Sequence, residues 1–293
     1  MALSKKQKKK RRRIIILSVV GVVVLAFGYL IYSYGIDYYR KYYACGGVEI
    51  DYYRFPVTGI DVASHQGKID WKEVYDSKVY FAFIKATEGE NFVDKRFKEN
   101  WKEAKQNNII VGAYHFFRFN KDGKEQAYNF INNVSLSADD LPPVLDVELY
   151  GGNKYTQETK NKVISEIFNC LRTLERHYER RPIVYTNIET YQNFIKGNFD
   201  DYDLWICKLC SEPKTLDWTF WQYNHSGDVP GIRSEVDLNI FNGNYSDFIN
   251  YLYDNKTRMS LVKQQHNVSY ADQLCVQCEI PYEVAQHIVG KEV

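Results

Sequence analysis

Short apolar runs alternate with amphipathic stretches over most of the chain, a pattern typical of strands connected by helices. The amphipathic stretches predict helices at 94–107, 124–133 and 156–179, with Asp94 and Thr156 as N-caps and Glu158 in the first turn of the third helix. A shorter stretch at 245–253 predicts a final helix. The apolar runs predict strands at 59–63, 79–86, 109–117, 141–148, 182–186, 204–207, 219–223 and 235–239.

Repeated strand–helix alternation predicts a parallel sheet, and at this length a closed barrel is the most economical way to bury it. The last three strands follow one another with little room for helices between them. The sequence therefore predicts an α/β fold, an irregular TIM-like β/α barrel whose last strands are short and antiparallel.

The N-terminus carries a different pattern. Residues 14–34 contain no charged side chain over 21 positions, which is long enough to cross a bilayer. Eight Lys or Arg residues at 5–13 precede them, which predicts a cytoplasmic N-terminus and a translocated C-terminal bulk. Tyrosines cluster after position 28, as interfacial aromatics do. We expect an uncleaved transmembrane signal anchor, and a cleaved signal peptide is the alternative.

These patterns divide the chain into five parts. A basic cytoplasmic tail (1–13) and a transmembrane anchor (14–34) come first, followed by a Tyr-rich stalk (35–56), the barrel (57–243) and a C-terminal extension (244–293). The net charge is +1, but without the eight basic residues near the N-terminus 30 basic residues face 37 acidic ones, which gives −7. The folded part therefore has no bulk attraction to nucleic acid.

Six cysteines occur, four of them in two C-x-x-C pairs, Cys207/Cys210 and Cys275/Cys278. The pairs invite a zinc interpretation, but their separation is far longer than in compact zinc ribbons. Outside the cytoplasm, structural disulfides or buried thiols are the favoured interpretation, with redox chemistry as a further alternative. We expect no metal and no cofactor.

The strand predicted at 141–148 ends in two acids, Asp146 and Glu148. Residues two apart on a strand point to the same face, so the two carboxyl groups must share one small space. Like charges held that close cannot both ionise freely, so one carboxyl group should keep its proton through a raised pKa. The alternative is a strand that ends in solvent with two surface acids.

Two further acids lie on predicted strands, Asp61 on the first and Asp237 on the last. In a barrel the carboxyl ends of the strands surround one area, so the four acids should converge there. Glycoside cleavage needs such a cluster, with one carboxyl group as proton donor and a negative group that stabilises an oxocarbenium-like transition state. We expect Glu148 to be the acid, with its pKa raised by Asp146. Asp146 and Asp237 would stabilise positive charge or orient substrate, and Asp61 would hold the network or bind sugar.

Several ordered motifs support this interpretation by resemblance. The segments are GIDVASHQG (59–67), FIKATEG (83–89), GAYHF (112–116), PVLDVE (143–148), PIVY (182–185), FWQY (220–223) and VDLN (236–239). Residues 57–243 thereby resemble glycoside hydrolase family 25, the N-acetylmuramidase-type lysozymes. The resemblance implies an irregular β/α barrel that hydrolyses the β-1,4 bond between N-acetylmuramic acid and N-acetylglucosamine in peptidoglycan. It also implies that Glu148 is the proton donor and that Asp61, Asp146 and Asp237 are the other active-site acids. Anomeric configuration would be retained, with either an Asp or the substrate's N-acetyl group as nucleophile.

Other residues are candidates for substrate contact. Rings at or near strand ends can stack on sugars, and these are Tyr114, Tyr185, Trp221 and Tyr223. Glu88 could touch the glycan or form a structural ion pair with Lys85, whereas His115 is expected to pack or form hydrogen bonds inside the fold. One departure from the family pattern is the sixth strand, which carries LWICKLC at 204–210.

The sequence therefore predicts a single-pass membrane protein whose barrel acts on peptidoglycan glycan strands on the extracytoplasmic side. It specifies no protein partner. The alternatives are a non-catalytic glycan-binding barrel and a Cys-pair metal or thiol protein.

Overall fold

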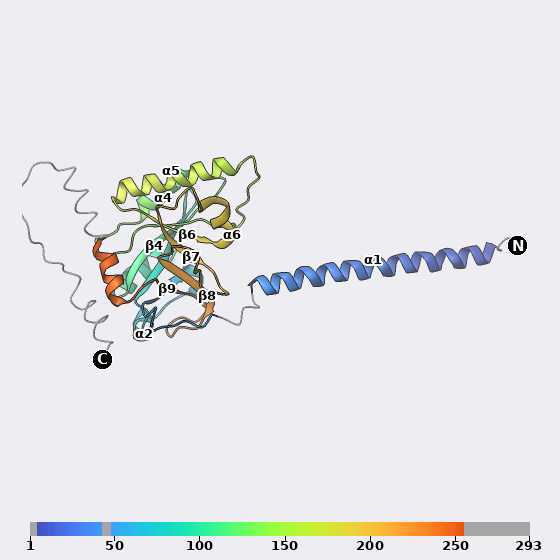
Figure 1. Cartoon of the computed structure of the whole chain (residues 1–293), viewed down its shortest axis with the longest axis horizontal. Coiled ribbons are helices and arrows are strands. Elements are labelled where there is room, and N and C mark those ends of the chain that lie inside the picture. Colours follow the sequence, from blue (N-terminus) through green and yellow to red (C-terminus); the bar gives the residue numbers. More distant parts are fainter. Residues whose placement is uncertain (1–4, 43–47, 255–293) are drawn as a thin grey trace, which may run out of the picture. The chain divides into compact units, whose positions relative to one another are not determined.

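A computed structural model of the chain describes residues 5–42 and 48–254 (Figure 1). The chain divides into two compact units, Met1–Gly47 and Val48–Val293. In the first unit, helix α1 (Lys5–Tyr42) contains the apolar segment Arg11–Gly35, which is long and apolar enough to cross a membrane. A signal sequence near an N-terminus can meet the same length and composition criteria, so the helix fits both alternatives.

The second unit is a closed barrel, as predicted. Eight strands form its wall in the order β1-β9-β8-β7-β6-β5-β4-β2, and pairing of β1 with β2 closes it. A ninth strand, β3 (Phe92–Val93), pairs antiparallel with β2 at the rim. The wall strands are β1 (Thr58–Val62), β2 (Phe81–Glu88), β4 (Ile110–Phe116), β5 (Val144–Asp146), β6 (Ile183–Asn187), β7 (Asp203–Cys207), β8 (Phe220–Gly227) and β9 (Val236–Phe241).

Strand β9 makes the barrel irregular. Every neighbouring pair from β1 through β2, β4, β5, β6 and β7 to β8 is parallel, whereas β9 runs antiparallel to both β8 and β1. The predicted antiparallel arrangement is therefore confirmed for the last strand and wrong for β7 and β8. Because β9 is reversed, its first residues lie at the same edge of the barrel as the last residues of β1.

Helices connect the strands and cover the wall (Figure 1). They are α2 (Trp71–Asp76), α3 (Phe97–Gln106), α4 (Gly123–Asn133), α5 (Lys160–Tyr178) and α6 (Ile188–Thr190), with a 3₁₀ turn at Ser64–Gln66, a π turn at Tyr191–Ile195 and helical residues at 245–254. Helix α4 starts where Asp122 caps it by accepting hydrogen bonds from the backbone N–H groups of Lys124 and Glu125. Helix α5 buries Ile167, Leu171 and Leu174, whose i, i+4, i+7 spacing gives one apolar stripe facing the core.

Three boundaries differ from the predictions. Helix α3 begins at Phe97, and Asp94 does not cap it; the Asp94 carboxylate instead accepts from the backbone N–H groups of Ser64 and Arg96. Helix α5 begins at Lys160, because Thr156 forms a local turn with Thr159 before the helix starts. Strand β5 ends at Asp146, so Glu148 lies two residues beyond it.

The barrel interior has an apolar layer of rings. Side chains facing inward include Phe81 and Phe83 of β2, Trp205 of β7, Phe220 of β8 and Phe241 of β9. Two glycines make room for this layer, because a Cβ atom at Gly59 would lie 2.3 Å from the Phe81 ring and one at Gly112 would lie 2.6 Å from the Phe83 ring. The layer fills the barrel, so polar inward-facing side chains are confined to its carboxyl edge.

Segments outside the predicted barrel also pack against it. Phe248 and Leu252 of the final helical segment join the interior cluster. Ile50 and Phe55 of the predicted stalk pack on the outer face of the wall with Trp218 and Trp221. The barrel's hydrophobic contacts therefore extend from about residue 50 to residue 252.

Candidate active site

The four predicted acids lie at the carboxyl edge of the barrel. Asp61 of β1 and Asp237 of β9 are direct partners in the antiparallel ladder, so their side chains share the inner face. Asp146 is the last residue of β5, and Glu148 continues the same inward row two residues later. Asp61 interacts electrostatically with each of the other three acids, which brings together acids from three separate stretches of the chain.

Asp61 is the best hydrogen-bonded of these acids. It is 8% exposed, and its Oδ2 accepts from Gln222 Nε2 and from Asn239 Nδ2, both at 2.8 Å. Burial raises the pKa of Asp61, while hydrogen bonds from Asn239, Gln222 and Asp237 oppose that shift. Burial first, and then the charge of Asp61, raises the pKa of Asp237 to about 9. At neutral pH the pair therefore holds a proton between its two carboxyl groups.

Burial also dominates the other two acids. It raises the pKa of Glu148 to about 7, with a further contribution from Asp61, against an opposing hydrogen bond from Asn187 and the charge of Lys85. The pKa of Asp146 is raised well above its usual range by burial and by Glu148. The predicted raised pKa of Glu148 is thus present, but its main causes are burial and Asp61. Asp146 Oδ1 is buried and has no hydrogen-bond partner among residues 5–42 and 48–254.

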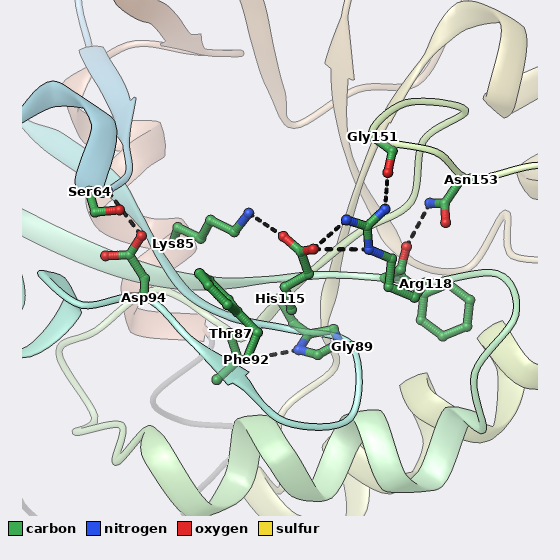
Figure 2. Close-up of polar contacts among 12 residues, drawn as sticks. Ser64, Lys85, Thr87, Gly89, Phe92, Asp94, His115, Arg118, Gly151 and Asn153 are labelled. Carbon is green, nitrogen blue, oxygen red and sulfur yellow. Dashed lines mark hydrogen bonds and ion pairs between the residues drawn. The ribbon is translucent and has the colours of Figure 1, made fainter.

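A charged network is built around Lys85 and Arg118, which Figure 2 shows, and Lys85 acts on Asp146 and Glu148. Lys85 follows Phe83 on the inner row of β2, and its Nζ lies 2.7 Å from Glu88 Oε2. Arg118 binds the other oxygen of Glu88 and also donates to the backbone carbonyl of Gly151. These cations lower the pKa of Glu88 despite its burial, so Glu88 is a charged member of the network. The ion pair that the sequence offered as one alternative for Glu88 is therefore present.

The Lys85 ammonium group connects this network to the acids. It lies 5.0 Å from the centre of the Phe116 ring and 5.7 Å from that of the Phe92 ring, positions that favour a cation. Its charge lowers the pKa of both Asp146 and Glu148. Lys85 is therefore a positive charge that acts on the acid cluster.

His115 lies on the outer face of β4 and is part of the fold, as expected. It is fully buried, with Nδ1 2.7 Å from Thr87 Oγ1 (Figure 2). Its Nε2 lies 3.4 Å from Gln126 Oε1. Burial lowers its pKa to about 4, so the ring is neutral at pH 7. It packs against Phe130 of α4 and holds that helix to the sheet.

The predicted aromatic contacts separate into two groups. Tyr114 and Tyr185 face inward with the acids, whose charges raise the pKa of both hydroxyls in addition to the larger effect of burial. Trp221 and Tyr223 alternate with the inward-facing Gln222 on β8 and point to the outer face. Trp221 is 1% exposed and donates to the Lys208 carbonyl, so it is not brought to the acids and has no free face for a sugar.

Two residues of the site were missed in the sequence, Gln222 and Asn239. Both belong to motifs that carry the family resemblance, but neither is an acid and each reads as an ordinary strand residue. The signal that identifies Asn239 is its i+2 spacing from Asp237, which places both on one face. Gln222 is found in the same way from its spacing to the inward-facing Phe220.

The cysteines in the described ranges agree with the favoured interpretation of structural disulfides or buried thiols. Cys210 is disulfide-bonded, whereas Cys170 and Cys207 are free thiols, so Cys207 and Cys210 are not bonded to each other. Cys45, Cys275 and Cys278 lie outside the described residues. No group of three His, Cys, Asp or Glu side chains within residues 5–42 and 48–254 is arranged to hold a metal ion.

Comparisons with known proteins agree with this geometry. The pattern of glycosyl hydrolases family 25 matches residues 60–232, more than half of the chain. A protein of Escherichia coli O6:H1 named "Uncharacterized protein YegX" is 36% identical over 197 residues, which are 64% of this chain and 71% of that protein. Lysozyme M1 of Streptomyces globisporus is 34% identical over 200 residues, 64% of this chain and 68% of the lysozyme.

The fold has a solved counterpart in a family 25 glycosyl hydrolase from Bacillus anthracis. The TM-score is 0.66 at 41% identity, over 70% of this chain and 96% of that chain. Within the family match lie Asp61, Asp146 and Glu148, and Asp237 follows five residues beyond its end.

Proposed function

The chain belongs to glycosyl hydrolases family 25, and from this membership we propose that it is a muramidase. The proposed reaction is hydrolysis of the β-1,4 bond between N-acetylmuramic acid and N-acetylglucosamine in peptidoglycan. The observation that carries the proposal is the environment of Glu148. Its carboxyl group has a pKa of about 7 and stands beside the buried Asp61 and Asp146 and the half-buried Asp237 at one edge of the barrel.

Glu148 is the proton donor in this proposal. A general acid works best when its pKa lies near the operating pH, because it then holds a proton and still releases it readily. Glu148 meets that requirement through burial, while Asn187 and Lys85 keep the shift moderate. The proton passes from the Glu148 carboxyl group to the glycosidic oxygen as the bond to the anomeric carbon breaks.

The three aspartates support the positive charge that develops on the sugar. A negative or strongly polar group facing the anomeric carbon lowers the energy of an oxocarbenium-like transition state. Asp61 carries hydrogen-bonded negative charge on the inner face. The unpartnered Oδ1 of Asp146 is suited to accept a hydrogen bond from a polar group of the substrate, such as its N-acetyl amide.

Substrate contacts are proposed for the inward-facing Tyr114 and Tyr185 and for the network around Glu88. Phe92 is 47% exposed and sits beside Lys85, so an exposed ring and a cation lie next to the acids. Sugar rings stack on aromatic faces, and charged groups orient their polar substituents. Trp221 and Tyr223 have no part in this proposal because they face away from the acids.

We further propose that α1 is an uncleaved anchor with a cytoplasmic N-terminus and that the barrel acts on the extracytoplasmic side. The basic run before the apolar segment supports this orientation. Intact-mass measurement of the membrane-extracted protein tests it. A mass of about 34.5 kDa supports the anchor, whereas loss of the N-terminal segment means that the helix is a cleaved signal.

Release of reducing ends from purified peptidoglycan tests the activity. The wild-type chain is compared with Glu148→Gln, which keeps the side-chain shape but removes the acidic proton, and with Glu235→Gln at an exposed position on the same side of the barrel. We expect Glu148→Gln to lower kcat by about 10²- to 10⁴-fold and Glu235→Gln to leave it unchanged. Mass spectrometry of the products identifies the cleaved bond, because a muramidase leaves N-acetylmuramic acid at the reducing end.

The opposite result is equally clear. Equal activity of wild type and Glu148→Gln would exclude Glu148 as the acid. A wild-type protein that binds peptidoglycan and releases no reducing ends would be a glycan-binding barrel.

A further inference from the structure

Two hydrogen-bond chains converge on one oxygen of Asp61. In the first, Trp205 Nε1 donates to Asn239 Oδ1 at 2.8 Å, and Asn239 Nδ2 donates to Asp61 Oδ2 at 2.8 Å. In the second, the Tyr185 hydroxyl donates to Gln222 Oε1 at 2.9 Å, and Gln222 Nε2 donates to the same Asp61 oxygen at 2.8 Å. The chains join five strands, β1, β6, β7, β8 and β9, and each of their side chains is buried.

In the first hydrogen-bond chain, the donor and acceptor roles are fixed. An indole N–H donates and cannot accept, so the Asn239 amide must turn its oxygen toward Trp205. The amide nitrogen then faces Asp61 and can only donate to it. Because Asn239 is fully buried, no water is available to replace either partner. Asp61 Oδ2 is therefore an acceptor from Asn239 and from Gln222.

The barrel core holds this direction in place. The Trp205 ring stacks on Phe83 with centroids 4.2 Å apart and packs against Tyr185 at 4.4 Å. A ring packed on two sides cannot rotate to point its N–H elsewhere without opening the core. The apolar layer thereby fixes the donor on which the Asn239 amide depends.

Asp237 completes the arrangement from the opposite strand. It hydrogen-bonds to Asp61 across the β1–β9 ladder. Two carboxylates cannot share a hydrogen bond unless one is protonated, and two charges directly opposite on adjacent strands repel. Since Asp61 Oδ2 already accepts two amide hydrogens, the proton belongs on Asp237, which then donates it toward Asp61.

We propose that Asn239 and Gln222 are positioning residues that hold Asp61 as the anion of a proton-sharing Asp61–Asp237 pair, with Trp205 and Tyr185 orienting the two amides. The inference rests on the proposed glycosidase function, in which Asp61 supplies the negative charge that faces the reacting sugar. Asp237 is then the neutral member of the pair, and the two amides orient the charged oxygen.

Other groups also face Asp61 and bear on any titration of the pair. They come from the strands and strand ends packed around it, and they are Asp237, Asp146, Glu148, Tyr114, Tyr185 and Cys207. None of them replaces the two amide donors. Asp146 and Glu148 add negative charge, and Asp61 is hydrogen-bonded to Asn239, Gln222 and Asp237.

Two substitutions of Asn239 separate positioning from packing. Asn239→Asp keeps the shape and still accepts from Trp205, but at pH 7.5 it places a carboxylate oxygen against Asp61. At pH 5 the introduced carboxyl group binds a proton and donates again. Asn239→Leu has a similar volume and no donor at any pH. Gln222→Glu repeats the Asn239→Asp test on the hydrogen-bond chain that starts at Tyr185. Thermal unfolding monitors the fold of each variant.

We expect Asn239→Asp to lower kcat on peptidoglycan roughly 10- to 100-fold at pH 7.5, the loss associated with one hydrogen bond to a charged group, with little change in KM. Its kcat relative to wild type should recover at pH 5, and Gln222→Glu should behave alike. Asn239→Leu should lose activity to the same extent at both pH values. The inference is overturned if the Asn239→Asp ratio is the same at both pH values, or if Asn239→Leu keeps wild-type kcat.

A second measurement works without substrate, so that failure of the proposed function remains distinguishable. The full chain in detergent micelles is labelled with ¹³C at the aspartate carboxyl carbons, and the two signals are assigned with Asp61→Asn and Asp237→Asn. We expect Asp61 to ionise at lower pH than Asp237. The reverse order overturns the inference, whether or not the wild-type chain releases reducing ends.

Discussion

Replacing Asp237 with asparagine should stabilise the barrel, and the gain should grow as the pH rises. The Asp237 carboxyl group has a pKa of about 9 in the folded protein, against about 3.9 for an aspartate in an unfolded chain. Between these pH values the folded state binds a proton that the unfolded state has released. The free energy of unfolding therefore falls with rising pH across that window.

The size of the effect follows from the shift. One proton changes the free energy of unfolding by at most about 1.4 kcal/mol per pH unit. Raising the pH from 5 to 7 therefore lowers the free energy of unfolding of the wild-type barrel by up to about 3 kcal/mol through Asp237. In a domain of this size that corresponds to roughly 6–12 °C in Tm. The amide introduced by Asp237→Asn does not ionise and can still donate to Asp61. The free energy of unfolding of the variant therefore lacks this pH-dependent decrease.

Thermal unfolding of the full chain, followed by circular dichroism at pH 5 and pH 7, measures the difference. Asp228→Asn is the matched control, since Asp228 is an exposed acid and its replacement changes the charge by the same amount. The Tm of Asp237→Asn should exceed that of wild type more at pH 7 than at pH 5, and the control should follow wild type. A gap that is constant or shrinks between the two pH values would refute the assignment of the proton to Asp237.

Three further results are expected. The activity of the wild-type chain should fall as the pH rises through about 7, because Glu148 must hold its proton. Rates measured from pH 5 to pH 9 on insoluble peptidoglycan check this, and activity that still increases above pH 8 would contradict it. Lys85→Gln should move that decline to higher pH, since the Lys85 charge lowers the pKa of Glu148, and an unchanged profile would show that the charge does not reach the acid. Cys207→Ser should keep activity close to that of wild type. Wild-type Cys207 should react slowly with iodoacetamide at pH 7, because burial raises the pKa of its thiol. Rapid alkylation with loss of activity would support the thiol hypothesis instead.

Much of the architecture was predictable because it depends on local periodicity. The apolar runs on β1, β2, β4, β6, β7, β8 and β9 lie within a few residues of their observed positions, since each strand is buried on at least one face and needs a near-continuous apolar sequence. The short helix α2 and strand β3 were not predicted, because too few residues carry their pattern.

The capping predictions failed for a physical reason. Asp94 and Thr156 are good cap residues by type, but other backbone donors compete for their side chains. Asp94 binds Ser64 across the barrel rim, a contact that only the folded chain provides. The raised pKa of Glu148 was predicted for a partly different cause: its own strand neighbour was expected to produce the shift, and burial and Asp61 produce it instead.

The sequence by itself determined the strand–helix alternation, the apolar N-terminal segment and the identity of the acids. These depend on residue type and on spacing along the chain, which are local properties. Only the tertiary structure decided that β9 runs backwards, which places Asp237 opposite Asp61, and that Gln222 and Asn239 donate to Asp61 while Trp221 turns outward. These features depend on which strands pair and which face each side chain occupies, and they involve residues as many as 178 positions apart in the sequence. The strand register that decides them is set when the whole barrel closes around its aromatic layer.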